Sequence, residues 1–168
     1  MKFPKDILVV DFEGLNGNPA QIGAVLLDKE TLVEKDSFVS YIFAEGPTSS
    51  KVSGITQEML VGAPTQAEVG KMVYDRFGTN LFFAYFVGDW DIRAFKILLK
   101  EAGIEFSKYD YHTIDIWSIA YAHLLKNGYT GGIRSEEIFQ AFGAKPRGLH
   151  NALEDCRITA DVLRKIVL

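Results

Sequence analysis

Two carboxyl residues, Asp11 and Glu13, end the apolar run Ile7-Leu8-Val9-Val10. Residues two apart on a strand point to the same face, so both side chains would share one face. Two carboxylates this close repel each other and raise each other's pKa unless a cation lies between them. The pair indicates either a cation site at the end of a buried strand or an ordinary strand end that reaches solvent.

A second acidic pair, Asp89 and Asp91, follows the apolar segment 81–87. Asp91 directly precedes Ile92-Arg93-Ala94-Phe95, where a helical pattern begins. Either aspartate could be the N-cap of that helix, which would contribute ~1 kcal/mol, or a cation ligand. The residues themselves leave both roles open.

His150 and Asp155 belong to a third cluster, His150-Asn151-Ala152-Leu153-Glu154-Asp155. Two helical residues five apart lie about 140° from each other around the axis, so they do not share a face. They can converge only if His150 lies in the turn that enters the helix, and Gly148 favours such a turn. Glu154, four residues after His150, would instead suit an exposed pair on the helix surface.

Together, the three clusters place carboxyl residues at strand ends or at a helix start, and His150 accompanies the last cluster. Enzymes that catalyse attack on a phosphodiester often use carboxylates that hold two divalent cations roughly 3.5–4 Å apart. Hard oxygen ligands favour Mg²⁺ or Mn²⁺. The imidazole of His150, with an unperturbed pKa near ~6.5, could deprotonate the attacking water.

The elements that must position these residues are strands first and then an alternation of helices and strands. Apolar and alternating runs predict an antiparallel meander over 7–10, 21–27 and 32–43. Further strands are expected over 81–87 and 113–115. Helices are expected over 56–60, 65–77, 92–102, 116–125, 135–142 (capped by Ser135) and 149–167. This order predicts an α/β protein, a mixed sheet with helices on its faces and its site beyond the carboxyl ends of the strands.

Composition and length bound the class of protein. The 168 residues suit one domain, expected over 1–168, and the 48% of hydrophobic residues exclude general disorder. A single cysteine, Cys156, excludes a disulfide framework and a cysteine-rich zinc site. No apolar run reaches the roughly 18 residues of a membrane span, and the N-terminus does not resemble a signal peptide. We therefore expect a cytoplasmic protein with no membrane partner.

The charge balance bears on nucleic acid. The chain has 18 basic and 22 acidic residues, a net charge of −4. A protein that coats a duplex by neutralising its phosphates would usually be basic. An acidic protein can still act on nucleic acid if its carboxylates hold cations that meet the phosphates. The charge therefore favours a cation-dependent site over non-specific coating.

The sequence resembles the DEDDh 3′-to-5′ exonucleases, which include ribonuclease T, the proofreading epsilon subunit of bacterial replicases and the histone-mRNA 3′ exonucleases. The motifs that carry the resemblance are Val9-Val10-Asp11-Phe12-Glu13, Trp90-Asp91 and His150-Asn151-Ala152-Leu153-Glu154-Asp155. Between the first two, Ser53-Gly54-Ile55-Thr56 is similar to the G-I-T element of the family. Order and spacing agree from about Ile7 to the C-terminus.

The resemblance implies the ribonuclease H-like fold, a five-stranded mixed sheet flanked by helices. It implies that the carboxylates of Asp11, Glu13, Asp91 and Asp155 bind two divalent cations, Mg²⁺ or Mn²⁺, that His150 is the general base, and that nucleoside 5′-monophosphates are released. Gly14 and Leu15 would meet the terminal sugar, and Ile55 would be an apolar wedge or stacking surface for the terminal bases. Asp89 matches no catalytic position, so a cap or supporting role is expected for it.

Two departures from the family pattern are Gly14, where many relatives have Thr, and Val87, where many have Asn. With Gly14, a hydroxyl contact to the 3′ end is not expected. The motif sequences Asp-Phe-Glu and Gly-Asp-Trp-Asp look more like those of the histone-mRNA exonucleases. This similarity favours RNA over DNA as the substrate. The expected partner is a single-stranded 3′ end, and the chain could act alone, as a homodimer or with a polymerase or helicase.

Two other functions are compatible with parts of this pattern. One is a catalytically weak nucleic-acid-binding or proofreading-type module within a larger complex. The loss of a catalytic residue would favour this function, and all five expected catalytic residues are present. The other is an aspartyl-phosphate phosphatase, which would need an aspartate in place of Glu13.

Overall fold

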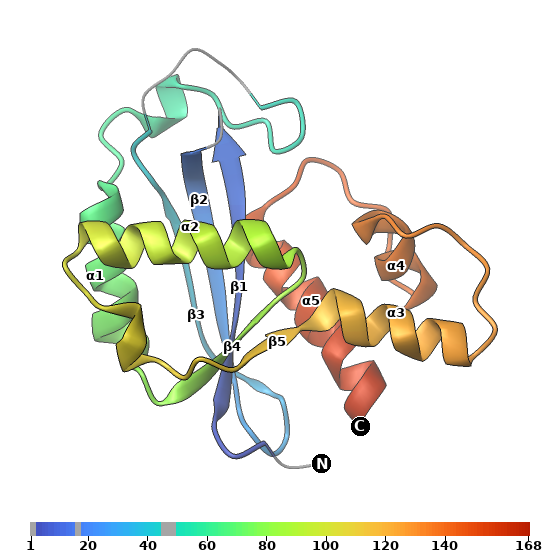
Figure 1. Cartoon of the computed structure of the whole chain (residues 1–168). Helices are drawn as coiled ribbons and strands as arrows, with labels where there is room; N and C mark the ends of the chain where they lie inside the picture. The colour runs from blue at the N-terminus through green and yellow to red at the C-terminus, as the bar shows by residue number, and fades with distance from the viewer. Residues whose placement is uncertain (1–2, 16–17, 45–49) are drawn as a thin grey trace.

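The computed structural model describes residues 3–15, 18–44 and 50–168. Within them, five strands form one mixed sheet in the order β3-β2-β1-β4-β5 (Figure 1). The strands are β1 (Asp6–Leu15), β2 (Asn18–Leu27), β3 (Glu34–Tyr41), β4 (Leu81–Tyr85) and β5 (Thr113–Asp115). β1 to β3 form an antiparallel meander, whereas β4 pairs in parallel with β1, and β5 in parallel with β4. The predicted mixed sheet of an α/β protein is confirmed.

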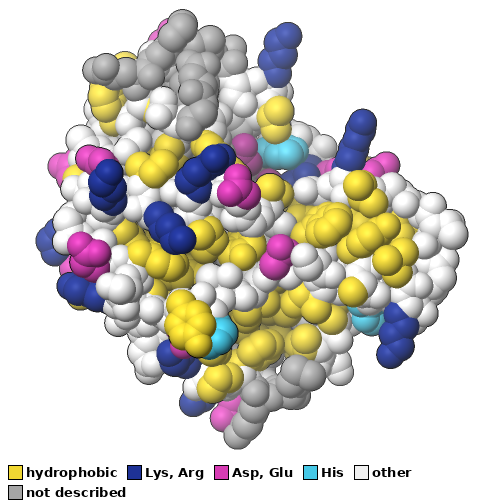
Figure 2. All heavy atoms as spheres, viewed as in Figure 1, with side chains coloured by type: hydrophobic (Ala, Val, Ile, Leu, Met, Phe, Trp, Pro, Cys, Tyr) yellow, Lys and Arg dark blue, Asp and Glu magenta, His cyan; other side chains and the backbone are white. Residues whose placement is uncertain are grey.

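Helices cover both faces of the sheet. They are α1 (Gln66–Phe77), α2 (Gly88–Glu101), α3 (Ile116–Lys126), α4 (Ser135–Ala141) and α5 (Ala152–Val167). α1 and α2 pack on one face, and α3, α4 and α5 pack on the other (Figure 1). The outer side of α2 carries Lys, Arg, Asp and Glu side chains (Figure 2), whereas its inner side buries Phe95, Leu98 and Leu99. None of the described helices is long and apolar enough to cross a lipid bilayer.

The alternation of side chains along β1 decides where its carboxylates point. Leu8 and Val10 belong to the core under α1 and α2, whereas Ile7 and Val9 belong to the core under α3, α4 and α5. Because the side-chain period of a strand is two, odd-numbered positions of β1 face α5. β1 continues past the predicted end at Val10 because its ladder with β2 extends through Leu15, with an irregularity between Glu13 and Gly14. The acidic pair is therefore held within a strand and not at a free strand end.

Two predicted helix starts near the acidic clusters are wrong. α2 begins at Gly88, four residues before the predicted start at 92, and Val87 occupies its N-cap without a side-chain cap bond. α5 begins at Ala152, three residues after the predicted start at 149, because the Asn151 side chain caps it by accepting bonds from two backbone N–H groups. This leaves His150 in the turn before the helix, as its spacing from Asp155 requires.

Other boundaries differ by less. The helix expected over 56–60 is a single 3₁₀ turn at Glu58–Leu60. Arg134, and not Ser135, occupies the N-cap of α4, and its backbone N–H donates to Glu137 Oε2 at 2.9 Å. A second 3₁₀ turn at Phe106–Lys108 precedes β5.

The start of α5 is pressed directly against β2. The Ala152 backbone N–H donates to the side-chain oxygen of Gln21 at 3.0 Å. At Gly23, an added Cβ would lie 2.3 Å from the carbonyl of Ala152, so only glycine allows this approach. The contact sets the distance between the His150 turn and the carboxylates of β1.

Candidate active site

The acidic pair of β1 supplies the first part of the site. Glu13 is only 8% exposed. The Oδ2 atom of Asp11 is buried and has no hydrogen-bond partner among the described residues. A buried carboxylate oxygen without a partner is costly unless a proton or a cation occupies that position.

Asp91 joins this pair from the first turn of α2. Its side chain is buried, with Oδ1 accepting from the Phe12 backbone N–H and Oδ2 from the Val87 backbone N–H, both at 3.2 Å. Trp90 Nε1 donates to the Phe12 carbonyl at 2.9 Å. These bonds fasten the beginning of α2 to the strand segment that carries the acidic pair.

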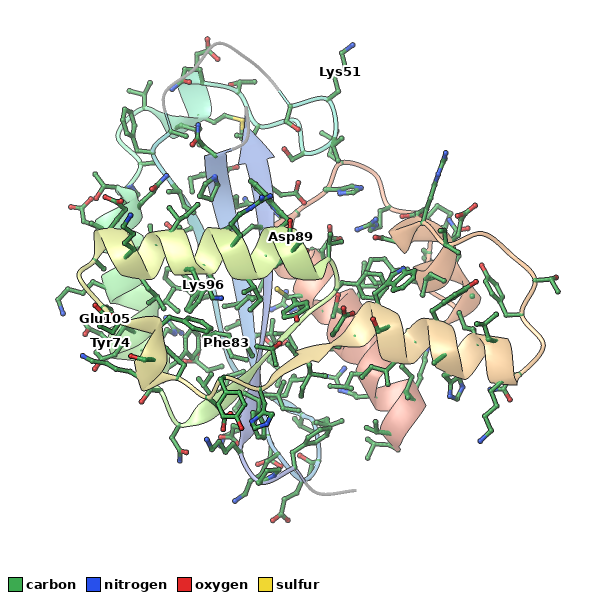
Figure 3. The ribbon with its side chains drawn as sticks, viewed as in Figure 1. Lys51, Tyr74, Phe83, Asp89, Lys96 and Glu105 are labelled. Carbon is green, nitrogen blue, oxygen red and sulfur yellow. The ribbon has the colours of Figure 1, made fainter. Side chains whose placement is uncertain are left out.

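Asp89 does not belong to the site, and the expected cap or supporting role is wrong. Figure 3 shows its side chain on the outer side of α2, where it is 91% exposed. It forms an ion pair with Arg93 at 3.6 Å, one turn along the same helix. Asp89 lies in the first turn of α2 and not before the helix, because α2 begins at residue 88 and not at the predicted residue 92.

His150 and Asp155 converge on the acidic pair from the other side. His150 Nδ1 lies 3.7 Å from Glu13 Oε1 and 3.7 Å from Asp155 Oδ2. The His150 backbone N–H donates to the Val52 carbonyl at 3.0 Å, so the loop that contains the G-I-T element supports the histidine turn. The three side chains of Glu13, His150 and Asp155 offer ligand atoms that all lie within 4.8 Å of one another.

Arg147 is a buried partner of Asp155. Its Nη1 lies 2.8 Å from Asp155 Oδ2, and its Nε lies 2.7 Å from Glu136 Oε2. Its side chain is 11% exposed, and the guanidinium lies over the Phe139 ring, 4.8 Å from the centroid. Sequence reasoning missed Glu136, since an acidic residue in the first turn of a helix carries no signal that it pairs with an arginine eleven residues later.

A cavity of about 170 Å³ brings these side chains together. It is lined by Asp11, Phe12, Glu13, Phe86, Val87, Trp90, Asp91, Ser135, Phe139, Arg147, His150 and Asp155. All five predicted catalytic residues are among them. Gly14 lies just outside, where Trp90 leaves no room for a Cβ.

Of the predicted base contacts, Ile55 is not among the described residues that line this cavity. Ile55 is 2% exposed and packs with Ala20, Ala44 and Leu60, so it offers no open surface on which a base could stack. The expected wedge role of Ile55 therefore gains no support from its position and stays a prediction. Leu15 ends β1, but its side chain lies outside the described residues.

Burial in a carboxylate cluster shifts the acid equilibria of the site. Burial, and to a lesser extent the charge of Asp155, raises the pKa of Glu13 to about 7, although Arg147 opposes the rise. Burial likewise raises the pKa of Asp91 to about 7. The pKa of Asp11 is raised well above its ordinary value, by burial first and then by the surrounding carboxylates.

These features fit a hard divalent cation. The donors are carboxylate oxygens with one imidazole beside them, a set that suits Mg²⁺ or Mn²⁺. A cation among Asp11, Glu13, Asp91 and Asp155 would satisfy the buried Oδ2 of Asp11. It would also offset the burial and the repulsion between carboxylates that raise the pKa values.

Comparisons with known proteins agree with this geometry. A family model described as an exonuclease, RNase_T, matches residues 8–163. The DNA polymerase III subunit epsilon of Aquifex aeolicus (strain VF5) is 28% identical over 164 residues, which are 96% of this chain and 78% of that protein.

Solved structures share the fold. The nuclease domain of 3′hExo, a DEDDh family member bound to rAMP, superposes with a TM-score of 0.74 at 23% identity, over 97% of this chain and 92% of that chain. Exonuclease I of E. coli, in complex with a dT13 oligonucleotide, superposes with a TM-score of 0.77 at 15% identity, over 96% of this chain and 41% of that chain. The chain thus spans less than half of exonuclease I.

Proposed function

Since this chain belongs to the RNase T family of DEDDh-type 3′-to-5′ exonucleases, which depend on divalent metal, we propose that its cavity hydrolyses the last phosphodiester of a single strand. The cation ligands in this proposal are Asp11, Glu13, Asp91 and Asp155. The observation that carries it is the convergence of these carboxylates and His150 on one cavity, with a buried oxygen of Asp11 left without a partner. The expected products are nucleoside 5′-monophosphates.

Each residue has a distinct proposed task. Two divalent cations, Mg²⁺ or Mn²⁺, would supply the positive charge that a phosphodiester needs when one oxygen attacks and another leaves. His150 takes the proton of the attacking water, and the nearby carboxylates of Glu13 and Asp155 stabilise the imidazolium that results. Arg147 holds Asp155 in place from the side of α4.

The terminal sugar would lie near Gly14, beside the Trp90 ring. Because the Trp90 Cζ2 atom would be 2.8 Å from a Cβ at this position, glycine lets the Trp90 ring pack against the backbone of β1 here. We propose single-stranded RNA as the preferred substrate, supported by the fold likeness to the 3′hExo nuclease domain bound to rAMP. The similarity to a DNA polymerase III subunit epsilon supports a second candidate, a proofreading module that assembles with a polymerase.

A degradation ladder tests the proposal. RNA and DNA oligonucleotides of matched sequence, labelled at the 5′ end, are incubated with Mn²⁺, with Mg²⁺ or with EDTA. We expect single-nucleotide steps from the 3′ end that require the cation. Asp155→Asn should abolish them, whereas Asp161→Asn, an exposed position on the same helix, should not.

Three results would contradict parts of the proposal. Hydrolysis that persists in excess EDTA would exclude the cation mechanism. A circular single strand cut as fast as a linear one would make the chain an endonuclease. DNA degraded faster than RNA would favour the proofreading function.

A further inference from the structure

A pocket of about 370 Å³ is formed by the end of α4, the loop that follows this helix and α5 (Figure 1). We call it the rear pocket. Phe139 and Arg147 line both the rear pocket and the catalytic cavity, so these two residues form a common wall. The described lining of the rear pocket includes none of the proposed cation ligands, nor His150. Small organic ligands occupy pockets of roughly 300–1,000 Å³, so the rear pocket could hold a ligand of its own.

The interior of the rear pocket is apolar. Ile158, Val162 and Lys165 are four and three residues apart, so they follow one face of α5. Val162 is buried and Ile158 is half-buried, and these two side chains form the deeper part of the lining. The Phe142 ring, from the end of α4, packs on the His123 ring with 5.8 Å between centroids. A supported aromatic ring with aliphatic side chains beside it suits a flat apolar ring.

The loop between α4 and the histidine turn is fixed at both ends. Gly143, the residue after the C-cap of α4, has a φ of 85°, a left-handed conformation that favours glycine and turns the chain out of the helix. At the other end, Arg147 donates to the Glu136 carboxylate twice, from its backbone N–H at 3.1 Å and from Nε at 2.7 Å. The rear pocket is therefore preformed, which lowers the entropy that a ligand must lose on binding.

The charged groups of the rear pocket favour an anion. Lys145 is exposed and has no ion pair or hydrogen bond in the part of the chain that the structure describes. Lys165 Nζ donates to the Phe142 carbonyl, so two of its three N–H donors stay available. The acid of the lining, Asp161, is already paired with Arg164. Two ammonium groups beside an apolar interior suit a ligand that carries a phosphate on an apolar ring system.

We propose that the rear pocket is a second ligand site, which binds a nucleoside monophosphate with its base in the apolar interior and its phosphate on Lys145 and Lys165. Other aromatic phosphates share this chemistry. A nucleoside monophosphate is favoured among them because the proposed reaction releases one on the other side of Phe139 and Arg147. The choice of ligand therefore rests on the proposed function, whereas the existence of the site does not.

Arg147 connects the rear pocket to the catalytic cavity. Its Nη1 lies 2.8 Å from Asp155 Oδ2, and the same side chain lines the rear pocket. A phosphate bound in the rear pocket attracts this guanidinium and competes with Asp155 for it. Bound nucleotide would thus loosen the hold of Arg147 on Asp155 and lower kcat from outside the catalytic cavity.

Calorimetry at pH 8 in EDTA tests binding apart from the catalytic cavity. When no cation is present, the carboxylates of that cavity repel a phosphate, so a nucleotide that binds under these conditions binds elsewhere. Adenosine 5′-monophosphate is titrated into the wild type and compared with adenosine, inorganic phosphate and phenyl phosphate. We expect one site for adenosine 5′-monophosphate, and about tenfold weaker binding or less of adenosine and of inorganic phosphate, since each lacks one of the two recognised groups.

Matched variants separate binding from loss of fold. Lys145→Glu and Lys165→Glu should each weaken binding of adenosine 5′-monophosphate about tenfold, because they replace attraction to the phosphate with repulsion. Lys165→Arg should keep the affinity. Lys126→Glu makes the same change of charge at the end of α3, outside the described lining of the rear pocket, and should bind as the wild type does. Thermal melting checks Lys165→Glu, which also loses a bond to the Phe142 carbonyl, whereas Lys145→Glu alters only an exposed side chain.

A rate measurement tests the connection through Arg147. In Mn²⁺, adenosine 5′-monophosphate should lower kcat for a single-stranded oligonucleotide in the wild type. Lys145→Glu should lose this effect and keep the rise in KM that comes from product in the catalytic cavity. A rise in KM alone in the wild type would show that the rear pocket does not act on Asp155.

The binding results discriminate between the two proposals. If adenosine 5′-monophosphate does not bind in EDTA, or if Lys145→Glu and Lys126→Glu bind it equally, the rear pocket is not a nucleotide site. Tighter binding of phenyl phosphate would overturn the choice of a nucleotide as the ligand. If the wild type binds the nucleotide in EDTA but degrades no oligonucleotide in Mn²⁺, the site stands and the proposed function fails.

Discussion

Replacing Glu13 with Gln should stabilise the metal-free protein above pH 7, although it removes a residue proposed to be essential. Glu13 is buried, and burial raises its pKa from the ordinary 4.5 to about 7. A shift of one pKa unit corresponds to about 1.4 kcal/mol, so ionising this group in the fold costs at most about 3 kcal/mol. Glutamine keeps the shape and removes the charge.

The sign and the pH window follow from linkage. An acid whose pKa is raised by folding binds its proton more tightly in the folded than in the unfolded chain. Its full contribution to stability is therefore present below pH 4.5, is lost as pH rises toward 7, and stays lost above that pH. Glu13→Gln lacks this dependence, so the variant should match the wild type near pH 4 and exceed it at pH 8.

The measurable effect is smaller than the upper limit, because the variant also loses the contact with His150 and the attraction to Arg147. We expect about 1–3 kcal/mol, which for a chain of this length raises Tm by roughly 3–10 °C. The assay is thermal unfolding in EDTA at pH 4, 6 and 8, with Glu101→Gln, at the exposed end of α2, as the control.

Addition of Mn²⁺ should reverse the order of stability, since a ligand that binds only the folded chain stabilises it by RT ln(1 + [L]/Kd) and the variant has lost one ligand. A Glu13→Gln protein that is less stable than the wild type at pH 8 in EDTA would refute the reasoning. An equal gain in the stability of Glu13→Gln at pH 4 would also refute the reasoning, because it could not come from removing the charge of Glu13.

Three further changes test the positioning of the site. His150→Ala should lower kcat by ~10²–10⁴ while calorimetry shows nearly unchanged Mn²⁺ affinity, and a large loss of affinity would instead make His150 a ligand. Arg147→Ala should destabilise the protein by about 3 kcal/mol in urea unfolding at pH 8, because Asp155 and Glu136 lose a buried partner; a change below about 0.5 kcal/mol would contradict this. Gly23→Ala should lower both Tm and kcat, since its Cβ would meet the Ala152 backbone. Gly148→Ala should be tolerated, because nothing lies within 4 Å of an added Cβ there. Equal effects of the two substitutions would exclude the tight approach of α5 to β2.

Several features of the fold could be predicted from the sequence because they depend on local periodicity. The uninterrupted apolar run Ile7-Leu8-Val9-Val10 indicated a strand buried on both faces, and the structure divides it between two cores. The spacing of Asp11 and Glu13 required a shared face. The five-residue separation of His150 and Asp155 required a turn at His150, and the cap at Asn151 produces that turn.

Other features could not be decided from the sequence, for equally local reasons. Asp91 and Asp89 both suited an N-cap, since the pattern could not show that α2 begins at Gly88. Gly148 was taken to favour the histidine turn, yet its backbone is not among the positive-φ glycines and nothing lies within 4 Å of an added Cβ. A glycine in sequence does not reveal whether its freedom is used.

The amino-acid sequence by itself determined the donors of the site and the face of each element on which they lie, because those properties repeat every two or 3.6 residues. The tertiary structure alone decided what each donor meets. Ala152 bonds to Gln21 across 131 residues of chain, Arg147 neutralises Asp155, and Ile55 is buried instead of open. Such contacts depend on how helices dock on the sheet, and docking is set by complementary shape and charge between distant segments, which no local period encodes.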